Sequence, residues 1–369
     1  MRSAQRRPQR NLTAFLGALL GMFLCACGGG SDESSSTTTT TALSTASAAN
    51  DLQAPKRRAS AANDLQAPKR RALAYDRQGV TAIVVASDGR AVGVANSDGS
   101  VRLLDASGSR ETKVLKPQGG AVAAGLVFSA DGRYLAAVGR DSVAQVWNIE
   151  TGERRFLLRG HEHALRSIAA SADGAVIATG GEETRVMVWD GGTGRLKRIF
   201  GGHTDFVNSV SVSADGRLLA SGDAAARILV WDIATGQLLH TLLGHANEVN
   251  VVVFNPDGKL LASAGEDGKV FLWDVAAGRQ AAALEGQRAP VRSLAFSRDG
   301  ALLAGGASDG KVEVWDMATR KVSLELAGST SAVNALAFDG SNQGQLFVGN
   351  QESRLLSVRV PRVPRVAAR

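Results

Sequence analysis

The stretch that decides the fold is residues 244–274, GHANEVNVVVFNPDGKLLASAGEDGKVFLWD. It begins with the pair Gly244-His245, turns at Asp257-Gly258 and ends in a Trp-Asp pair. Apolar runs flank the Asp-Gly, which is a hairpin signal because glycine takes a positive φ without steric penalty. The stretch therefore predicts short β-strands joined by tight turns.

The same three markers recur along the chain with a period of 42 residues. Tryptophans stand at positions 147, 189, 231, 273 and 315, and aspartate follows four of the five. Gly-His pairs at His161, His203 and His245 lie 28 residues before their tryptophans, and Asp-Gly turns keep the same phase. Extending the phase to Leu104 and Val358 gives seven units. Four short strands per unit leave no room for a crossover helix, so the pattern predicts an all-β fold.

This repeat resembles the WD40 family, whose four-stranded blades surround a central channel. The resemblance implies a seven-bladed β-propeller over residues 69–360. Closing the ring requires an outer strand for the last blade. Two segments compete for that place, 69–75 and the basic tail 361–369 with its two prolines. Because proline suits only a strand edge, we prefer the N-terminal segment.

The family resemblance also implies a buried hydrogen-bonded set in each blade, made of a histidine, a hydroxyl, an acid and the tryptophan. Unit four has Ala225 where the acid is expected, and Asp223 is a candidate substitute. Units two and six keep the acids Asp141 and Asp309 but have Gly119 and Gln287 in place of the histidine. The matching residues are His245, Ser263, Asp267 and Trp273 in unit five, His161, Thr179, Glu183 and Trp189 in unit three, and His203, Ser221 and Trp231 in unit four.

WD40-like propellers mostly bind other proteins on the face rimmed by the loops between units. Phe206 is the informative residue there, because an exposed aromatic beside polar side chains is typical of an interface anchor. The alternative, that Phe206 packs into its own blade, stays open at this point. The residues that the resemblance places on this face are Phe206, Arg166, Asn208, Asn250, Glu248, Arg292, Glu182 and Glu266, with Thr81, Arg140, Asn334 and Gln351 from the weaker units.

The N-terminus has the features of a secretory signal. Residues 1–10 carry four arginines and no acid, and 11–24 are apolar but too short to remain as a membrane-spanning helix. Leu24-Cys25-Ala26-Cys27 resembles a bacterial lipobox, which implies a signal peptide over 1–26 and lipidation of Cys27. An ordinary secretory signal ending in cysteine is the alternative. Gly28 after the cysteine, in place of aspartate, favours the outer membrane over the inner.

Residues 27–68 are expected to form a disordered tether. The segment is low in complexity, and SAANDLQAPKRRA at 47–59 repeats at 60–72. The formal charge of +7 is concentrated at the two ends of the chain. A basic balance of this kind is no sign of nucleic-acid binding, and we expect none.

These patterns predict a membrane-anchored WD40 lipoprotein that acts as a protein-interaction scaffold in the bacterial cell envelope, facing the periplasm as a monomer. No phosphate loop, nucleophile elbow or metal-ligand spacing stands out, so we expect no enzyme activity, cofactor or metal. The alternatives are a glycan- or peptidoglycan-binding propeller and a propeller hydrolase or lyase. Both cysteines lie at 25 and 27, so the rest of the chain has no disulfide.

Overall fold

A computed structural model describes residues 70–72, 79–117, 122–326, 331–340, 344–352 and 355–361. The chain divides into two units, 1–62 and 63–369, and the described residues belong to the second. The expected signal peptide, Cys27, the tether up to residue 69 and the tail from 362 lie outside the described residues. No helix among the described residues is long and apolar enough to cross a membrane.

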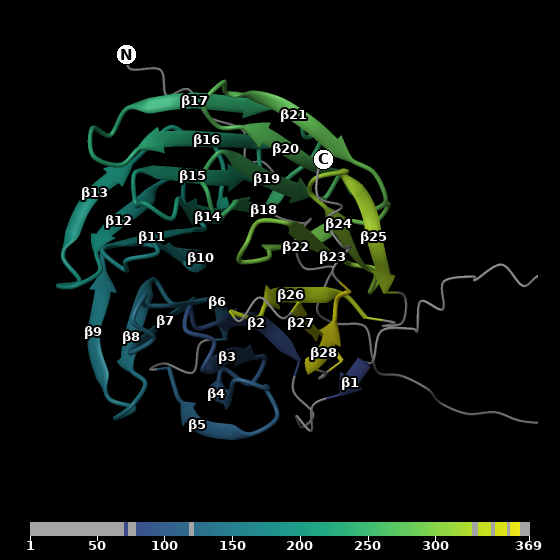
Figure 1. The fold of residues 1–369 in the computed structure, drawn as a ribbon. Helices are drawn as coiled ribbons and strands as arrows, with labels where there is room; N and C mark the ends of the chain where they lie inside the picture. Colours follow the sequence, from purple (N-terminus) through teal and green to yellow (C-terminus); the bar gives the residue numbers. More distant parts are fainter. Residues whose placement is uncertain are drawn as a thin grey trace, which may run out of the picture. The chain divides into compact units, whose positions relative to one another are not determined.

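The described residues form seven four-stranded antiparallel sheets arranged as the blades of a propeller (Figure 1). The innermost strands are β2 (Val80–Val85), β6 (Ala123–Phe128), β10 (Leu165–Ala170), β14 (Val207–Val212), β18 (Val249–Phe254), β22 (Val291–Phe296) and β26 (Val333–Phe338). The second strands are β3 (Ala91–Asn96), β7 (Tyr134–Gly139), β11 (Val176–Gly181), β15 (Leu218–Asp223), β19 (Leu260–Gly265), β23 (Leu302–Ala307) and β27 (Gln345–Asn350). The third strands are β4 (Val101–Asp105), β8 (Val143–Asn148), β12 (Val186–Asp190), β16 (Arg227–Asp232), β20 (Val270–Asp274), β24 (Val312–Asp316) and β28 (Leu355–Arg359). The outer strands are β5 (Glu111–Leu115), β9 (Arg154–Arg159), β13 (Leu196–Phe200), β17 (Leu238–Leu243), β21 (Arg279–Leu284), β25 (Lys321–Leu326) and β1 (Arg70–Ala72).

Each innermost strand neighbours the innermost strands of the two adjacent blades, and β26 neighbours β2, so the ring is closed. The last blade combines both ends of the described chain, in the order β1-β28-β27-β26. Arg70 pairs with Val358 and Ala72 with Leu356. This confirms that the N-terminal segment supplies the closing strand. Residues 73–75 of the expected strand lie outside the described residues.

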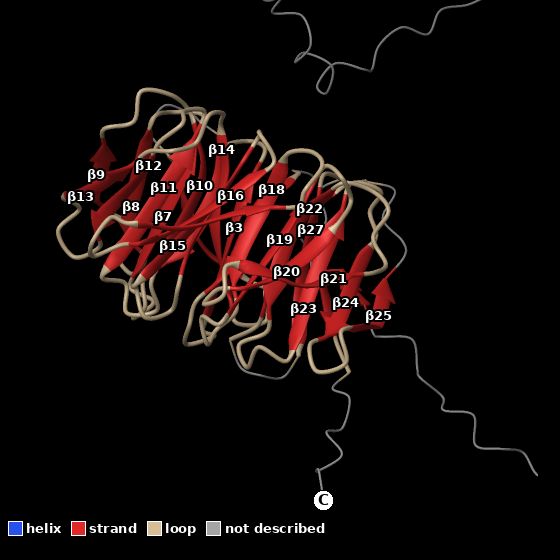
Figure 2. Ribbon diagram, turned by 90° about the horizontal axis from the view of Figure 1, so that it is seen from above, coloured by secondary structure: helices blue, strands red, loops and turns tan. Residues whose placement is uncertain are grey.

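The Asp-Gly turns join the first and second strands on one face of the ring, opposite the loops that connect successive blades (Figure 2). In the turn of the fourth blade, Gly216 has a φ of 70°. Asp215 accepts a hydrogen bond from the Ser213 hydroxyl at 2.6 Å and one from the Arg217 N–H at 3.1 Å. The Ser-x-Asp-Gly spacing therefore specifies the turn through both its glycine and its aspartate.

Hydrophobic packing between blades forms the core. Trp231 packs with Val188 and Phe200 of the preceding blade, and Trp273 packs in the same way with Val230 and Leu242. The repeating tryptophan thus seals each blade against the one before it. The second and third strands are largely buried, while the outer strands are largely exposed.

Candidate functional site

The third and fifth blades contain the hydrogen-bonded set that the family pattern implies. In the fifth, His245 Nε2 lies 2.8 Å from Ser263 Oγ, His245 Nδ1 lies 2.9 Å from Asp267 Oδ2, and the Trp273 indole donates to Ser263 Oγ at 2.8 Å. In the third, His161 lies between Glu183 and Thr179, and the Trp189 indole donates to Thr179 at 2.8 Å. These groups tie the loop before each blade to its second and third strands.

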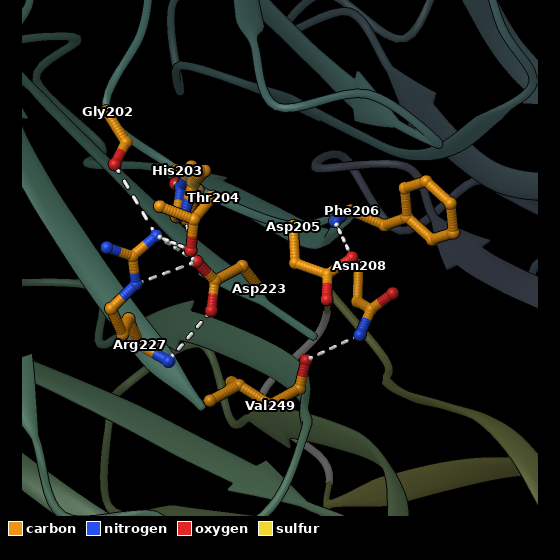
Figure 3. A network of polar contacts seen from close by, with 10 residues as sticks. Gly202, His203, Thr204, Asp205, Phe206, Asn208, Asp223, Arg227 and Val249 are labelled. Carbon is orange, nitrogen blue, oxygen red and sulfur yellow. Dashed lines mark hydrogen bonds and ion pairs between the residues drawn. The ribbon is translucent and has the colours of Figure 1, made fainter. Parts of the chain in front are cut away.

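In the fourth blade the acid comes from Asp223, not from the position of Ala225. His203 Nδ1 lies 2.7 Å from Asp223 Oδ2 (Figure 3). His203 Nε2 contacts the Ser221 hydroxyl. Asp223 is the strand partner of Val207. At the equivalent place in the third blade, Gly181 is the strand partner of Leu165. The aspartate therefore reaches the histidine from the end of β15, two residues earlier than in the other blades.

Arg227 also belongs to the hydrogen-bonded set in this blade. Its N–H donates to Asp223 Oδ1 at 2.8 Å, and its guanidinium donates to Asp223 Oδ2 at 3.0 and 3.2 Å. The same guanidinium donates to the Thr204 hydroxyl at 2.7 Å. The pKa of Asp223 lies below its usual range, because hydrogen bonds from His203 and Arg227 outweigh the opposing effect of burial.

Burial lowers the pKa of His161 and His245 below the ordinary histidine value, despite the acid beside each ring. Both rings are therefore neutral at neutral pH, and all their ring nitrogens are engaged in the contacts above. Binding of a metal ion by His161 would break its contact with Glu183 or with Thr179. Within the described residues, no group of three or more His, Cys, Asp or Glu side chains is placed to hold a metal ion.

The sixth blade departs from the pattern in a way that the repeat markers do not show. Gly305 stands at the hydroxyl position, and a Cβ there would meet the Trp315 ring. The Trp315 indole donates instead to Glu285 O at 2.9 Å, and Gln287 donates to Gly305 O at 3.1 Å.

Sequence reasoning also missed Glu313 in the sixth blade. Its buried carboxylate lies 2.7 Å from Lys311 Nζ, and burial raises the pKa of Glu313. Its signal was an acid two residues before Trp315, where the other tryptophan-bearing blades have no charged residue.

The innermost strand of each blade has a β-bulge, and the seven bulges place one side chain per blade at the same level around the ring. In each innermost strand the register with the second strand shifts across a single residue. A residue inserted in this way has no partner opposite it, and its side chain is re-aimed. The bulge residues are Thr81, Ala124, Arg166, Asn208, Asn250, Arg292 and Asn334. All but Ala124 are residues that the family pattern assigns to the binding face.

Four of these side chains reach the backbone of the next blade. Asn208 Nδ2 donates to Val249 O at 3.2 Å, a contact visible in Figure 3. Asn250 donates to Val291 O at 3.0 Å and Asn334 to Val80 O at 3.1 Å. The Thr81 hydroxyl donates to Ala123 O at 2.6 Å. The bulge residues therefore link adjacent blades as well as line one surface.

The exposed Phe206 and the half-buried Arg166 lie side by side on this surface. The Arg166 guanidinium donates to Asn208 Oδ1 at 2.7 Å and to Glu182 at 3.2 Å, and its Cζ lies 5.5 Å from the centre of the Phe206 ring. Phe206 is 43% exposed, so it does not pack into its own blade. In Figure 3 its ring points away from the network around Asp223.

A pocket of about 260 Å³ lies beside this pair. It is lined by Arg166, Asn208, Asn250, Glu266 and Arg292, and Glu266 accepts a hydrogen bond from Asn250 at 2.9 Å. The lining residues come from the third to the sixth blade, so the pocket opens at the mouth of the channel. We call this pocket the channel-mouth pocket.

The remaining residues assigned to this face do not line the pocket. Glu248 accepts the Glu266 N–H through its carbonyl at 2.9 Å, and the Gln351 N–H donates to Ala332 O at 3.2 Å. The Arg140 side chain is exposed.

Comparison with known proteins supports the repeat assignment for part of the chain. The model of the WD domain, G-beta repeat, matches residues 194–232, 236–274 and 278–316. The model of the cytochrome D1 heme domain matches residues 88–204. The chain matches no protein in the curated collection.

Several potential haem ligands within the cytochrome D1 match are engaged or buried in the blades. A haem iron needs an accessible histidine, cysteine, methionine or tyrosine ligand. His161 and His203 have both ring nitrogens engaged, and Met187 is buried in the core between the second and third blades. His163 is exposed and Tyr134 is half-buried, so burial excludes neither of them as a ligand. The findings together show WD40 repeats within an all-β seven-bladed propeller.

Proposed function

We propose that the chain is a membrane-anchored WD40 lipoprotein that binds a protein partner through the face around Phe206, as a scaffold in the bacterial cell envelope. The observation that carries the binding proposal is the exposed Phe206 ring beside the Arg166 guanidinium. Aromatic and arginine side chains dominate the energetic centres of protein interfaces. The bulge side chains hold Arg166 in place from the next blade, which reduces the ordering cost of binding.

The geometry favours binding over catalysis. The buried histidines are engaged in contacts within their own blades, and every side chain of the channel-mouth pocket except Arg292 contacts another side chain or the backbone. The hydroxyls that contact histidines, Ser221 and Ser263, are fully buried, so a substrate cannot reach them. A fixed polar rim with one aromatic anchor is suited to recognising a protein surface.

Phe206→Ala tests the binding face. Loss of an interface anchor costs at least about 2 kcal/mol, so retention of the partner should fall about thirtyfold. The measurement is crosslinking in cells followed by affinity purification of the full chain. Leu243→Ala is the matched control, because Leu243 is 66% exposed on an outer strand away from this face and should leave retention unchanged.

Two results would contradict the proposal. One is partner retention by Phe206→Ala equal to that of the unmodified chain. The other is loss of the folded state in Phe206→Ala, which would mean that the ring has a packing role.

The anchor is proposed from the residues before and at Cys27, with Gly28 favouring the outer membrane. Lipidation would give several acyl chains, and at about 0.8 kcal/mol per buried CH₂ these hold a protein durably on a membrane. Cys27→Ala should therefore shift the protein from the membrane to the soluble fraction or leave it unprocessed. Cys25→Ala is the control and should be processed normally. Equal processing and fractionation of Cys27→Ala and the unmodified chain would rule out the anchor.

A further inference from the structure

The channel-mouth pocket is lined by more positive than negative side chains. It contains two guanidinium groups, from Arg166 and Arg292, and one carboxylate, from Glu266. Glu266 accepts a hydrogen bond from Asn250 at 2.9 Å, and Glu182 nearby is paired with Arg166 at 3.2 Å. Arg292 is exposed and has no hydrogen bond or ion pair with any described residue. Glu266 keeps its charge, because its partner Asn250 is neutral, and Arg292 is the guanidinium of the pocket that has no carboxylate partner among the described residues.

The other polar groups of the pocket are fixed in place. Asn208 and Asn250 donate to backbone carbonyls of the following blades, and Asn208 Oδ1 accepts from Arg166. Arg166 uses two of its N–H groups in its contacts with Asn208 and Glu182, and an arginine carries five. The pocket thus presents donors from the third and the sixth blade, on a frame that needs no rearrangement.

The volume of the pocket limits the size of what enters it. At about 260 Å³ it is smaller than the sites that enclose drug-sized ligands, which start at about 300 Å³. It is suited to a single side chain or chain end. Planar guanidinium groups match a carboxylate in both shape and charge.

We propose that the channel-mouth pocket binds a carboxylate of the partner polypeptide, an acidic side chain or a C-terminus, between Arg166 and Arg292. This inference rests on the proposed protein-binding function and names the chemistry of the partner. Phe206 would contact the apolar surface next to that carboxylate, because Arg166 belongs to the pocket and also lies over the Phe206 ring.

The direct test is binding of a fluorescent oligoglutamate peptide to the full chain, with an oligoglutamine peptide of equal length as the uncharged comparison. We expect only oligoglutamate to bind, and its affinity to fall as salt is raised. Arg292→Gln should weaken binding about tenfold or more, the usual loss for one charge-assisted hydrogen bond. Arg288→Gln is the matched control, since Arg288 is an exposed arginine four residues away that does not line the pocket, and it should bind as the unmodified chain does.

Three outcomes overturn the proposal. The first is equal binding of the two peptides, and the second is equal affinity of Arg292→Gln and the unmodified chain. The third is competition by free glutamate at the same concentration of carboxylate groups, which would identify a small-molecule site. If Arg292→Gln retains the cellular partner while Phe206→Ala loses it, the protein-binding function stands and the carboxylate inference fails.

Discussion

Replacing Asp223 with alanine is expected to lower the free energy of unfolding by about 3–5 kcal/mol, the usual effect of removing one partner from a buried ion pair. Asp223 is fully buried and accepts hydrogen bonds from Arg227 while contacting the His203 ring. Its loss would leave a guanidinium without its counter-charge and a buried imidazole without its partner. The measurement is denaturant unfolding at neutral pH.

Asp215→Ala is the matched control for Asp223→Ala. Asp215 lies in the Asp-Gly turn of the same blade and is exposed, so its loss removes only turn hydrogen bonds. We expect a decrease of about 1 kcal/mol, the typical net value of such a bond. Equal losses for the two variants would contradict the role assigned to Asp223.

The pH dependence gives this prediction a second readout. The pKa of Asp223 is lower in the folded chain than in the unfolded chain, where it is about 3.9. The unfolded state therefore binds the proton first as the pH falls. The stabilisation by Asp223 is fully present above about pH 4 to 5 and is lost as the pH falls through the folded value. The difference in stability between the unmodified chain and Asp223→Ala should shrink over this acid range.

Asp223 also shows where sequence reasoning reached its limit in the fold. The period of the tryptophans and the Asp-Gly turns predicted seven four-stranded blades, because these markers act locally within each unit. The acid of the fourth blade could only be suggested, since its contact with His203 depends on how the end of β15 meets the loop before the blade. Sequence spacing does not report that tertiary geometry.

The candidate site was predictable residue by residue but not as a pocket. The family pattern named Arg166, Asn208, Asn250 and Arg292 as exposed positions. The structure adds the physical reason, a bulge in every innermost strand, and the donation from each asparagine to the next blade. Whether a charged side chain of the pocket has a partner depends on contacts between adjacent blades, such as that of Arg166 with Asn208, 42 residues further along the chain. A single repeat does not contain that information.

The closing strand carries the second large expected effect. β1 is the outer strand of the last blade and pairs with β28 over three residues, from Arg70 to Ala72. Shortening the chain to begin at residue 73, in place of residue 70, removes these pairs and leaves the edge of β28 open. At about 1 kcal/mol per backbone hydrogen bond, we expect a loss of about 3 kcal/mol in stability, measured by denaturant unfolding.

Two further observations separate ring closure from a general effect of truncation. An open edge at β28 offers unpaired backbone groups to other chains, so the chain that begins at 73 should self-associate, as seen by light scattering. Removing residues 362–369 is the control and should leave both stability and association unchanged, because β1 already occupies the outer edge of the last blade. If the chains that begin at 70 and at 73 unfold at the same denaturant concentration, three residues of β1 do not close the ring. In that case the propeller would owe its closure to the packing of β26 between β2 and β22, where the innermost strands of the last, first and sixth blades meet.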